Sequence, residues 1–122
     1  MRLVLDSDPR INLVRRYGGG VIVIGEQHIT RPCIVTAQQL LPQWSATSIA
    51  ELSAAQLEPL FALDVSIVLL GGGETHHFAQ PAIRAAFRSR GIALECMNLG
   101  AACRTYNILA SEERTVAAGL FP

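Results

Sequence analysis

The chain has 122 residues, half of them apolar, and its ten basic residues balance ten acidic ones. This length is typical of one domain, and we expect residues 1–122 to form a single folding unit with its own core. A balanced charge argues against nucleic-acid binding. Every basic residue is arginine, which excludes catalysis that depends on a lysine.

The cysteine count and the N-terminus bear on the cellular compartment. Three widely spaced cysteines, an odd number with no C-x-x-C pair, indicate free thiols in a reducing environment. The first ten residues include Asp6 and Asp8 and lack the apolar core of a signal peptide. No apolar run approaches the roughly 20 residues that span a bilayer. We therefore expect a cytoplasmic protein that does not bind membranes.

The first half of the chain predicts β-structure. β-Branched residues fill 21–24 between glycines, and Gly18–Gly20 predict a turn before them. A second β-rich run covers 29–35, so the pattern predicts a β-hairpin or a short meander. Ser53 then begins a predicted short helix, because Gln56 follows at the spacing of a capping box.

The middle of the chain predicts a strand–helix–strand unit. Residues 65–70 are almost all apolar, as expected for a buried central strand. Pro81 is well placed in the first turn of a helix, and Gly91 is well placed to end it. Residues 92–97 form the next predicted strand. This length suits a crossover between parallel strands.

Two further helices are predicted at the C-terminal end. The first covers about 101–110. Ser111 is a favourable N-cap for the second, whose apolar face would consist of Val116, Ala117 and Leu120. Strands followed by alternating strands and helices predict an α/β fold.

The strongest candidate for a ligand site is the glycine run after the buried strand. Gly71, Gly72 and Gly73 could present backbone N–H groups to an anion at the edge of the sheet where α/β proteins bind ligands. The dinucleotide fingerprint is incomplete, because His76 stands where a third glycine is needed. The alternative is a turn that glycine makes for steric reasons alone.

Three residues of the predicted helix 101–110 are further candidates. Cys103 lies in its first turn, where the helix dipole favours a thiolate, although a buried and inert cysteine is the alternative. Arg104 and Asn107 could together recognise a carboxylate or phosphate. Alternatively, they hold neighbouring loops by hydrogen bonds.

No catalytic residue, metal or cofactor is assigned. The neighbouring residues His76 and His77 point in different directions on most backbones, so one metal ion rarely binds both. Glu74 is the one carboxylate beside the glycine run, and it has no evident partner for acid–base work.

The segment Ala101–Leu109 resembles a family of uncharacterised small domains, whose eukaryotic members include an assembly factor of mitochondrial respiratory complex I. The similarity rests on Cys103, Arg104 and Asn107, and it extends to the glycine run and to Glu112–Arg114. The resemblance implies a three-layer α/β fold with a mixed central sheet and an additional N-terminal β-hairpin. It implies no established catalytic activity.

Two functions follow as hypotheses. The first is a non-enzymatic interaction or assembly protein with an unidentified protein partner, for which a second copy of the chain is one candidate. The second is a domain that binds a small molecule or an anion, or a thiol-dependent enzyme, with its site at Gly71–Gly73 and Cys103–Asn107. A concave pocket between these two segments would favour the second hypothesis.

Overall fold

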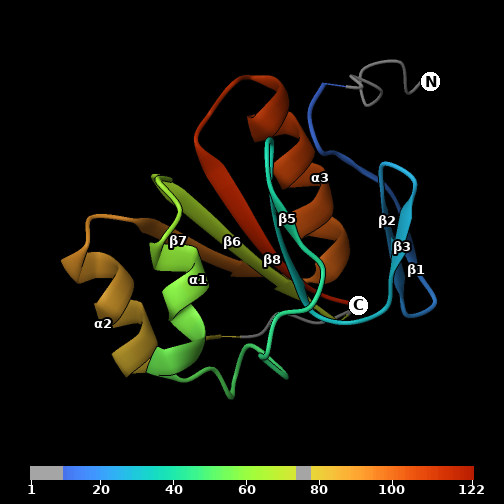
Figure 1. Cartoon of the computed structure of the whole chain (residues 1–122). Coiled ribbons are helices and arrows are strands. Elements are labelled where there is room, and N and C mark those ends of the chain that lie inside the picture. The colour runs from blue at the N-terminus through green and yellow to red at the C-terminus, as the bar shows by residue number, and fades with distance from the viewer. Residues whose placement is uncertain (1–9, 74–77) are drawn as a thin grey trace.

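The computed structural model describes residues 10–73 and 78–122 (Figure 1). The residues Asp6, Asp8, Glu74, His76 and His77 lie outside this part of the chain. In chain order the elements are β1 (Val14–Gly18), β2 (Val21–Ile24), β3 (Gln27–Ile29), β4 (Cys33–Thr36), β5 (Leu40–Leu41), the 3-10 helix η2 (Ala54–Leu57), α1 (Glu58–Phe61), β6 (Ile67–Gly72), α2 (Pro81–Ser89), β7 (Ala93–Met97), α3 (Leu99–Ser111) and β8 (Val116–Phe121).

The predicted N-terminal β-structure is present as a small antiparallel sheet in the order β1-β2-β3. Gly18, Gly19 and Gly20 make the turn between β1 and β2, all three with positive φ angles. This backbone conformation strongly favours glycine, as the sequence predicted. The second predicted run is divided, because β3 ends at Ile29 and β4 begins at Cys33 in the other sheet.

The larger sheet has five strands in the order β5-β4-β8-β6-β7. Strand β6 is parallel to both β7 and β8, whereas β4 is antiparallel to β8, so the sheet is mixed. The predicted strand–helix–strand unit is confirmed as β6, α2 and β7. Pro81 is the first residue of α2, and Gly91, with a φ of 70°, follows its end.

The helices cover the two faces of the large sheet (Figure 1). Helix α3 and the small sheet lie on one face, where Ala118 and Leu120 of β8 share a core with Tyr106. Helices α1 and α2 lie on the other face, where Ala117 packs in a second core with Phe87. Three layers and a mixed sheet confirm the predicted fold class.

The predicted C-terminal helix is wrong. Residues 116–121 form β8, and Ser111 is the last residue of α3 rather than an N-cap. All six residues of β8 are buried because both faces of the sheet are covered. A strand buried on both faces has no polar alternation to distinguish it from a helix. Gly119 lets this strand pack against Trp44, since a β-carbon there would lie 2.7 Å from the Trp44 ring.

The helical segment after Ser53 begins as predicted and is short. The Ser53 N–H donates to the Gln56 side chain over 3.0 Å, and one 3-10 turn leads into four residues of α-helix. Among the described residues, no helix combines the length and apolarity needed to cross a membrane.

Candidate functional site

The glycine run meets the start of α3 directly. Gly71 and Gly72 are the last residues of β6, and only Gly73, with a φ of 68°, makes the turn. The predicted turn therefore begins two residues later than expected. The Leu99 N–H donates to the Gly73 carbonyl over 3.0 Å. A β-carbon on Gly71 would collide with the β-carbon of Ala102, so glycine here permits the close approach of α3 to the sheet.

Cys103 lies in the core between α3 and the sheet and is 1% exposed. The pKa of its thiol is raised to about 12, chiefly by burial and also by the nearby Cys33, while Arg104 acts in the lowering direction. Cys33 on β4 is equally buried, and burial raises its pKa to about 12 as well. A thiol that is protonated at neutral pH is a poor nucleophile. The buried interpretation of Cys103 therefore fits the structure better than the thiolate interpretation.

Arg104 is exposed and reaches toward β1 of the small sheet. Its Nη1 donates to the Tyr17 hydroxyl over 2.6 Å. The two side chains lie over Gly100, where a β-carbon would be 2.9 Å from the Tyr17 hydroxyl and 3.1 Å from Nη1 of Arg104. Gly100 therefore allows Tyr17 to pack across the start of α3.

Asn107 also bonds to β1, one helical turn further along α3. Its Nδ2 donates to the Val14 carbonyl over 2.8 Å, and its Oδ1 accepts the Val14 N–H over 2.9 Å. Tyr106, which the site prediction omitted, donates its hydroxyl to the Asn12 carbonyl over 2.7 Å. These bonds agree with the alternative in which polar residues of α3 hold neighbouring segments in place.

The six predicted site residues thus divide between two roles in the fold. The glycines and Cys103 let α3 pack closely on the large sheet. Arg104 and Asn107 attach α3 to the small sheet. Ligand binding at these six residues stays a prediction.

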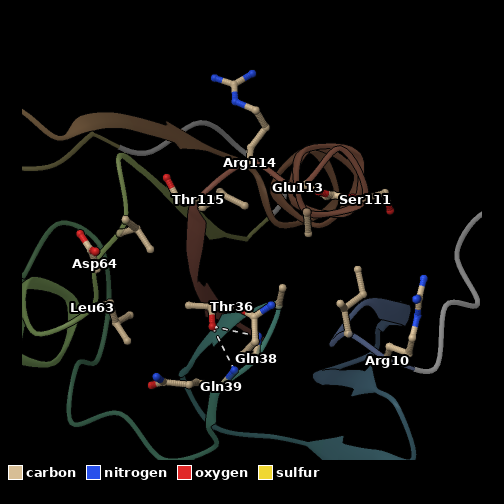
Figure 2. Close-up of a pocket in the computed structure, with 15 residues that line it drawn as sticks. Arg10, Thr36, Gln38, Gln39, Leu63, Asp64, Ser111, Glu113, Arg114 and Thr115 are labelled. Atoms are coloured by element: carbon tan, nitrogen blue, oxygen red, sulfur yellow. Dashed lines mark hydrogen bonds between the residues drawn. The ribbon is translucent and has the colours of Figure 1, made fainter.

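The structure contains a cleft of about 730 Å³ at the opposite end of the large sheet, where β6 and β8 begin (Figure 2). Its lining residues, drawn in Figure 2, come from four separate segments of the chain. They are residues 10–11, 36–39, 63–65 and, without residue 112, 110–116. Small molecules bind in clefts of this size, and no sequence motif pointed to it.

The lining of this cleft is polar and carries charges of both signs. The hydroxyl of Thr36, one of its buried groups, accepts the N–H groups of Gln38 and Gln39 over 3.3 and 3.0 Å. Asp64 and Arg114 are exposed at its rim. Its side chains offer hydroxyl, amide and charged groups for polar contact.

A smaller groove of about 330 Å³ lies on the small sheet. It is lined by Arg16, Tyr17, Gly18, Val21, Val23 and His28. Among the described residues, no group of three or more histidine, cysteine or acidic side chains is placed to hold a metal ion.

The family of the chain follows from its sequence. The model of a family described as "Protein of unknown function (DUF498/DUF598)" matches residues 14–121. The chain belongs to this family. The match spans every strand and helix described above, from β1 to β8.

Named relatives include assembly factors. "NADH dehydrogenase (ubiquinone) 1 alpha subcomplex assembly factor 3" of Bos taurus is 28% identical over 98% of this chain and 66% of its own length. The protein of the same name from Xenopus tropicalis is 29% identical over 99% of this chain and 66% of its own length. The chain thus spans just under two thirds of both. A "13 kDa major membrane protein" of Francisella tularensis is 27% identical, covering 84% of this chain and 85% of that protein.

Solved structures of bacterial proteins share the fold. A crystal structure from Bordetella parapertussis superposes with a TM-score of 0.84 at 28% identity, covering 92% of this chain and 96% of that one. An NMR structure from Xanthomonas campestris superposes with a TM-score of 0.82 at 33% identity, covering 98% of this chain and 89% of that one. A Bordetella pertussis structure described as an "Mth938-like domain" superposes with a TM-score of 0.78 at 26% identity, covering 100% of this chain and 92% of that one. The resemblance found in the sequence is confirmed.

Proposed function

We propose that this chain is a non-enzymatic assembly-type protein, which binds a partner protein and holds it during the formation of a larger complex. The observation that carries the proposal is the role of the polar side chains of α3. Arg104, Tyr106 and Asn107 each bond to the N-terminal part of the chain. These bonds engage the three side chains within the fold, which supports a role in partner binding rather than in chemistry on a substrate.

The state of the thiols supports the same proposal. Cys33 and Cys103 are fully buried, and their pKa values of about 12 keep them protonated at neutral pH. A thiol-dependent enzyme needs an accessible thiolate and a base beside it. The segment around Cys103 offers hydrophobic packing instead.

The names of the relatives suggest which complex is assembled. Proteins from Bos taurus and Xenopus tropicalis are named as assembly factors of NADH dehydrogenase. We extend the proposal to a role in respiratory complex assembly, with the partner being a component of that complex and the chain acting from the cytoplasmic side. A homodimer is the alternative form of association.

The test is deletion of the gene in its own organism, followed by measurement of assembled NADH dehydrogenase on native gels. We expect less assembled complex, which the full chain restores. The Cys103→Ala variant should restore it equally if the protein is not a thiol enzyme, provided that folded protein accumulates to the same level. Normal assembly in the deletion strain would overturn the respiratory role. A folded Cys103→Ala variant that fails to restore assembly would overturn the non-enzymatic role.

A further inference from the structure

The edge strand β7 is open on the face of the large sheet that carries α3. Side chains alternate between the two faces of a strand. On β7, Leu94 and Cys96 pack in the core beneath α2, whereas Met97 packs against the core beneath α3. Ala93 and Glu95 therefore point to the α3 side, and both are exposed. Parallel strands such as β6 and β7 are usually covered on both faces, so an open strand here is unusual.

The flank of α3 that faces β7 is open as well. On the opposite flank, Arg104 and Asn107 bond to the small sheet, and Figure 1 shows the small sheet and β7 on opposite sides of α3. Successive residues of a helix are about 100° apart around its axis. Thr105 and Leu109 therefore lie about 200° from Asn107, on the side of β7. Both are half-buried, and the neighbouring Ile108 is 58% exposed.

The open flank and the open strand run side by side. Gly71 pairs with Met97 and lies against Ala102, so α3 starts level with the end of β7. Because α3 connects the end of β7 to the start of β8, and both strands are parallel to β6, the helix runs antiparallel to β7. Four residues of a helix and two residues of a strand each advance about 6–7 Å, so Thr105 is level with Glu95. The name "α3–β7 face" is used below for Ala93, Glu95, Met97, Ala101, Thr105 and Ile108.

The α3–β7 face is apolar around one carboxylate. Met97 and Ile108 offer apolar surface, and Glu95 stands beside them. Glu112 adds a second exposed carboxylate two helical turns after Thr105, on the same flank of α3. In the part of the chain that the structure describes, neither Glu95 nor Glu112 has an ion-pair partner. The two carboxylates are therefore available to a positively charged partner.

We propose that the α3–β7 face docks an amphipathic helix of the partner protein. The apolar stripe of that helix would lie against Met97 and Ile108, and arginine or lysine side chains beside the stripe would pair with Glu95 and Glu112. Helices of this kind bind their targets through apolar anchors at helical spacing. The inference rests on the proposed function, because it names the chemistry of the partner that this function requires.

A helix suits this face better than an extended segment. Helices are the elements that normally cover parallel strands, and a helix here would lie beside α3 in the same layer. The axes of packed helices are about 8–10 Å apart, and small side chains at the contact favour the shorter distances. Ala101 and Thr105 provide small side chains on the open flank of α3.

A second copy of the chain suits the face less well. Two copies joined through the same face would bring their Glu95 side chains together, and like charges repel. Helix α2 carries the exposed residues Arg84 and Arg88, but it lies on the opposite face of the large sheet. Docking α2 on the α3–β7 face of another copy would leave one helix and one face free in every pair, and would build open chains. A different protein with a basic helix fits the charge without this difficulty.

The experiment uses the purified full chain and a fluorescein-labelled peptide with three repeats of Leu-Arg-Ala-Lys-Leu-Ala-Ala, followed by fluorescence anisotropy. In a helix the leucines of this peptide form one stripe, with a basic side chain on each side of it. We expect saturable binding that weakens as salt is added. An acidic peptide with Glu in place of Arg and Lys should not bind. A peptide with Pro in place of the Ala between Arg and Lys should not bind either, because proline prevents the helix.

Charge-reversal variants test the role of the carboxylates. Glu95→Arg should weaken binding by about tenfold or more, since it converts an attraction into a repulsion. The matched control, Glu26→Arg, makes the same change at an exposed residue between β2 and β3, and should change affinity by less than about twofold. Ile108→Ser should weaken binding by about fivefold through lost apolar contact. A double variant with Glu95→Arg and Glu112→Arg should bind the acidic peptide instead of the basic one.

A second measurement maps the peptide on the protein. Amide signals in NMR spectra should shift in β7 and α3. The proposal is overturned by shifts confined to other elements, by the absence of saturable binding, or by equal binding of the acidic or the proline peptide. Equal loss of affinity in Glu95→Arg and Glu26→Arg would also overturn it. So would self-association of the chain that Glu95→Arg abolishes, since this would assign the face to a second copy.

Complementation separates this inference from the proposed function. If gene deletion impairs complex assembly while Glu95→Arg restores it fully, the docking site is wrong and the proposed function stands. If deletion leaves assembly intact while the variants respond to the peptides as expected, the respiratory role is wrong and the α3–β7 face still docks a basic helix.

Discussion

The side chain of Asn107 binds both backbone polar groups of Val14, donating to its carbonyl over 2.8 Å and accepting its N–H over 2.9 Å. Val14 is the first residue of β1, an edge strand of the small sheet. The side-chain amide of Asn107 therefore pairs with Val14 as the backbone of a residue on a neighbouring strand would. Through this pair α3 joins the small sheet to the large one.

We predict that Asn107→Ala lowers the free energy of unfolding by about 2–3 kcal/mol, because it leaves a donor and an acceptor of Val14 without partners. Urea unfolding followed by circular dichroism measures the change. Ser111→Ala, an exposed substitution on the same helix, should change stability by less than about 0.5 kcal/mol. Equal effects of the two substitutions would contradict a bridging role for Asn107.

We predict that Gly71→Ala destabilises the fold by about 1–3 kcal/mol, since the new methyl group would overlap the Ala102 side chain. Ala102→Gly removes that methyl group and costs about 1 kcal/mol through helix propensity. The double variant should lose less than the sum of the two single losses. Simple additivity in this double-mutant cycle would show that the two residues do not compete for space.

We predict that stability falls as the pH rises from about 9 toward 12. Folding raises the pKa values of Cys33 and Cys103 from 9.0 to about 12. The unfolded chain therefore loses these protons first, and the stabilisation, complete below pH 9, declines by ~1.4 kcal/mol per pH unit for each thiol. Urea titrations at pH 8, 9.5 and 10.5 measure the slope. Cys103→Ala should reduce the slope by the contribution of one thiol, ~1.4 kcal/mol per pH unit. An unchanged slope would argue against burial of a protonated thiol at Cys103.

We predict that Glu113→Gly stabilises the protein by about 1 kcal/mol, because Glu113 has a φ of 63°, where glycine is favoured. The neighbouring Glu112 is the matched control. Its φ is −89°, so Glu112→Gly should be destabilising. Thermal unfolding of the two variants should shift in opposite directions. A lower melting temperature for Glu113→Gly would indicate that the Glu113 side chain contributes contacts that outweigh its backbone strain.

Local patterns in the sequence predicted most of the fold. The β-branched run at 21–24 and the glycines before it specify β2 and its turn without help from the rest of the chain. Pro81 and Gly91 mark the two ends of α2 in the same local way. These features need no knowledge of tertiary neighbours, and each is present in the structure.

The errors arose where tertiary packing decides the outcome. Val116, Ala117 and Leu120 have a spacing that fits a helical face, and only cores on both sides of the sheet make residues 116–121 a strand. Gly71 was predicted to lie in a turn because its role depends on Ala102, thirty-one positions later in the chain. The candidate site suffered from the same limitation. The sequence offered two roles for Asn107, and choosing between them required the position of Val14.

The position of β8 has a consequence for biosynthesis. It is the last strand in the chain, yet it lies between β4 and β6 at the centre of the large sheet. While a ribosome still holds residues 116–121, the earlier strands lack the neighbour that joins them, and their apolar faces stay uncovered. Pairings between distant residues also form slowly. We therefore expect the large sheet to form only after β8 has emerged from the ribosome. A chaperone that covers apolar surface would protect the nascent chain during that interval.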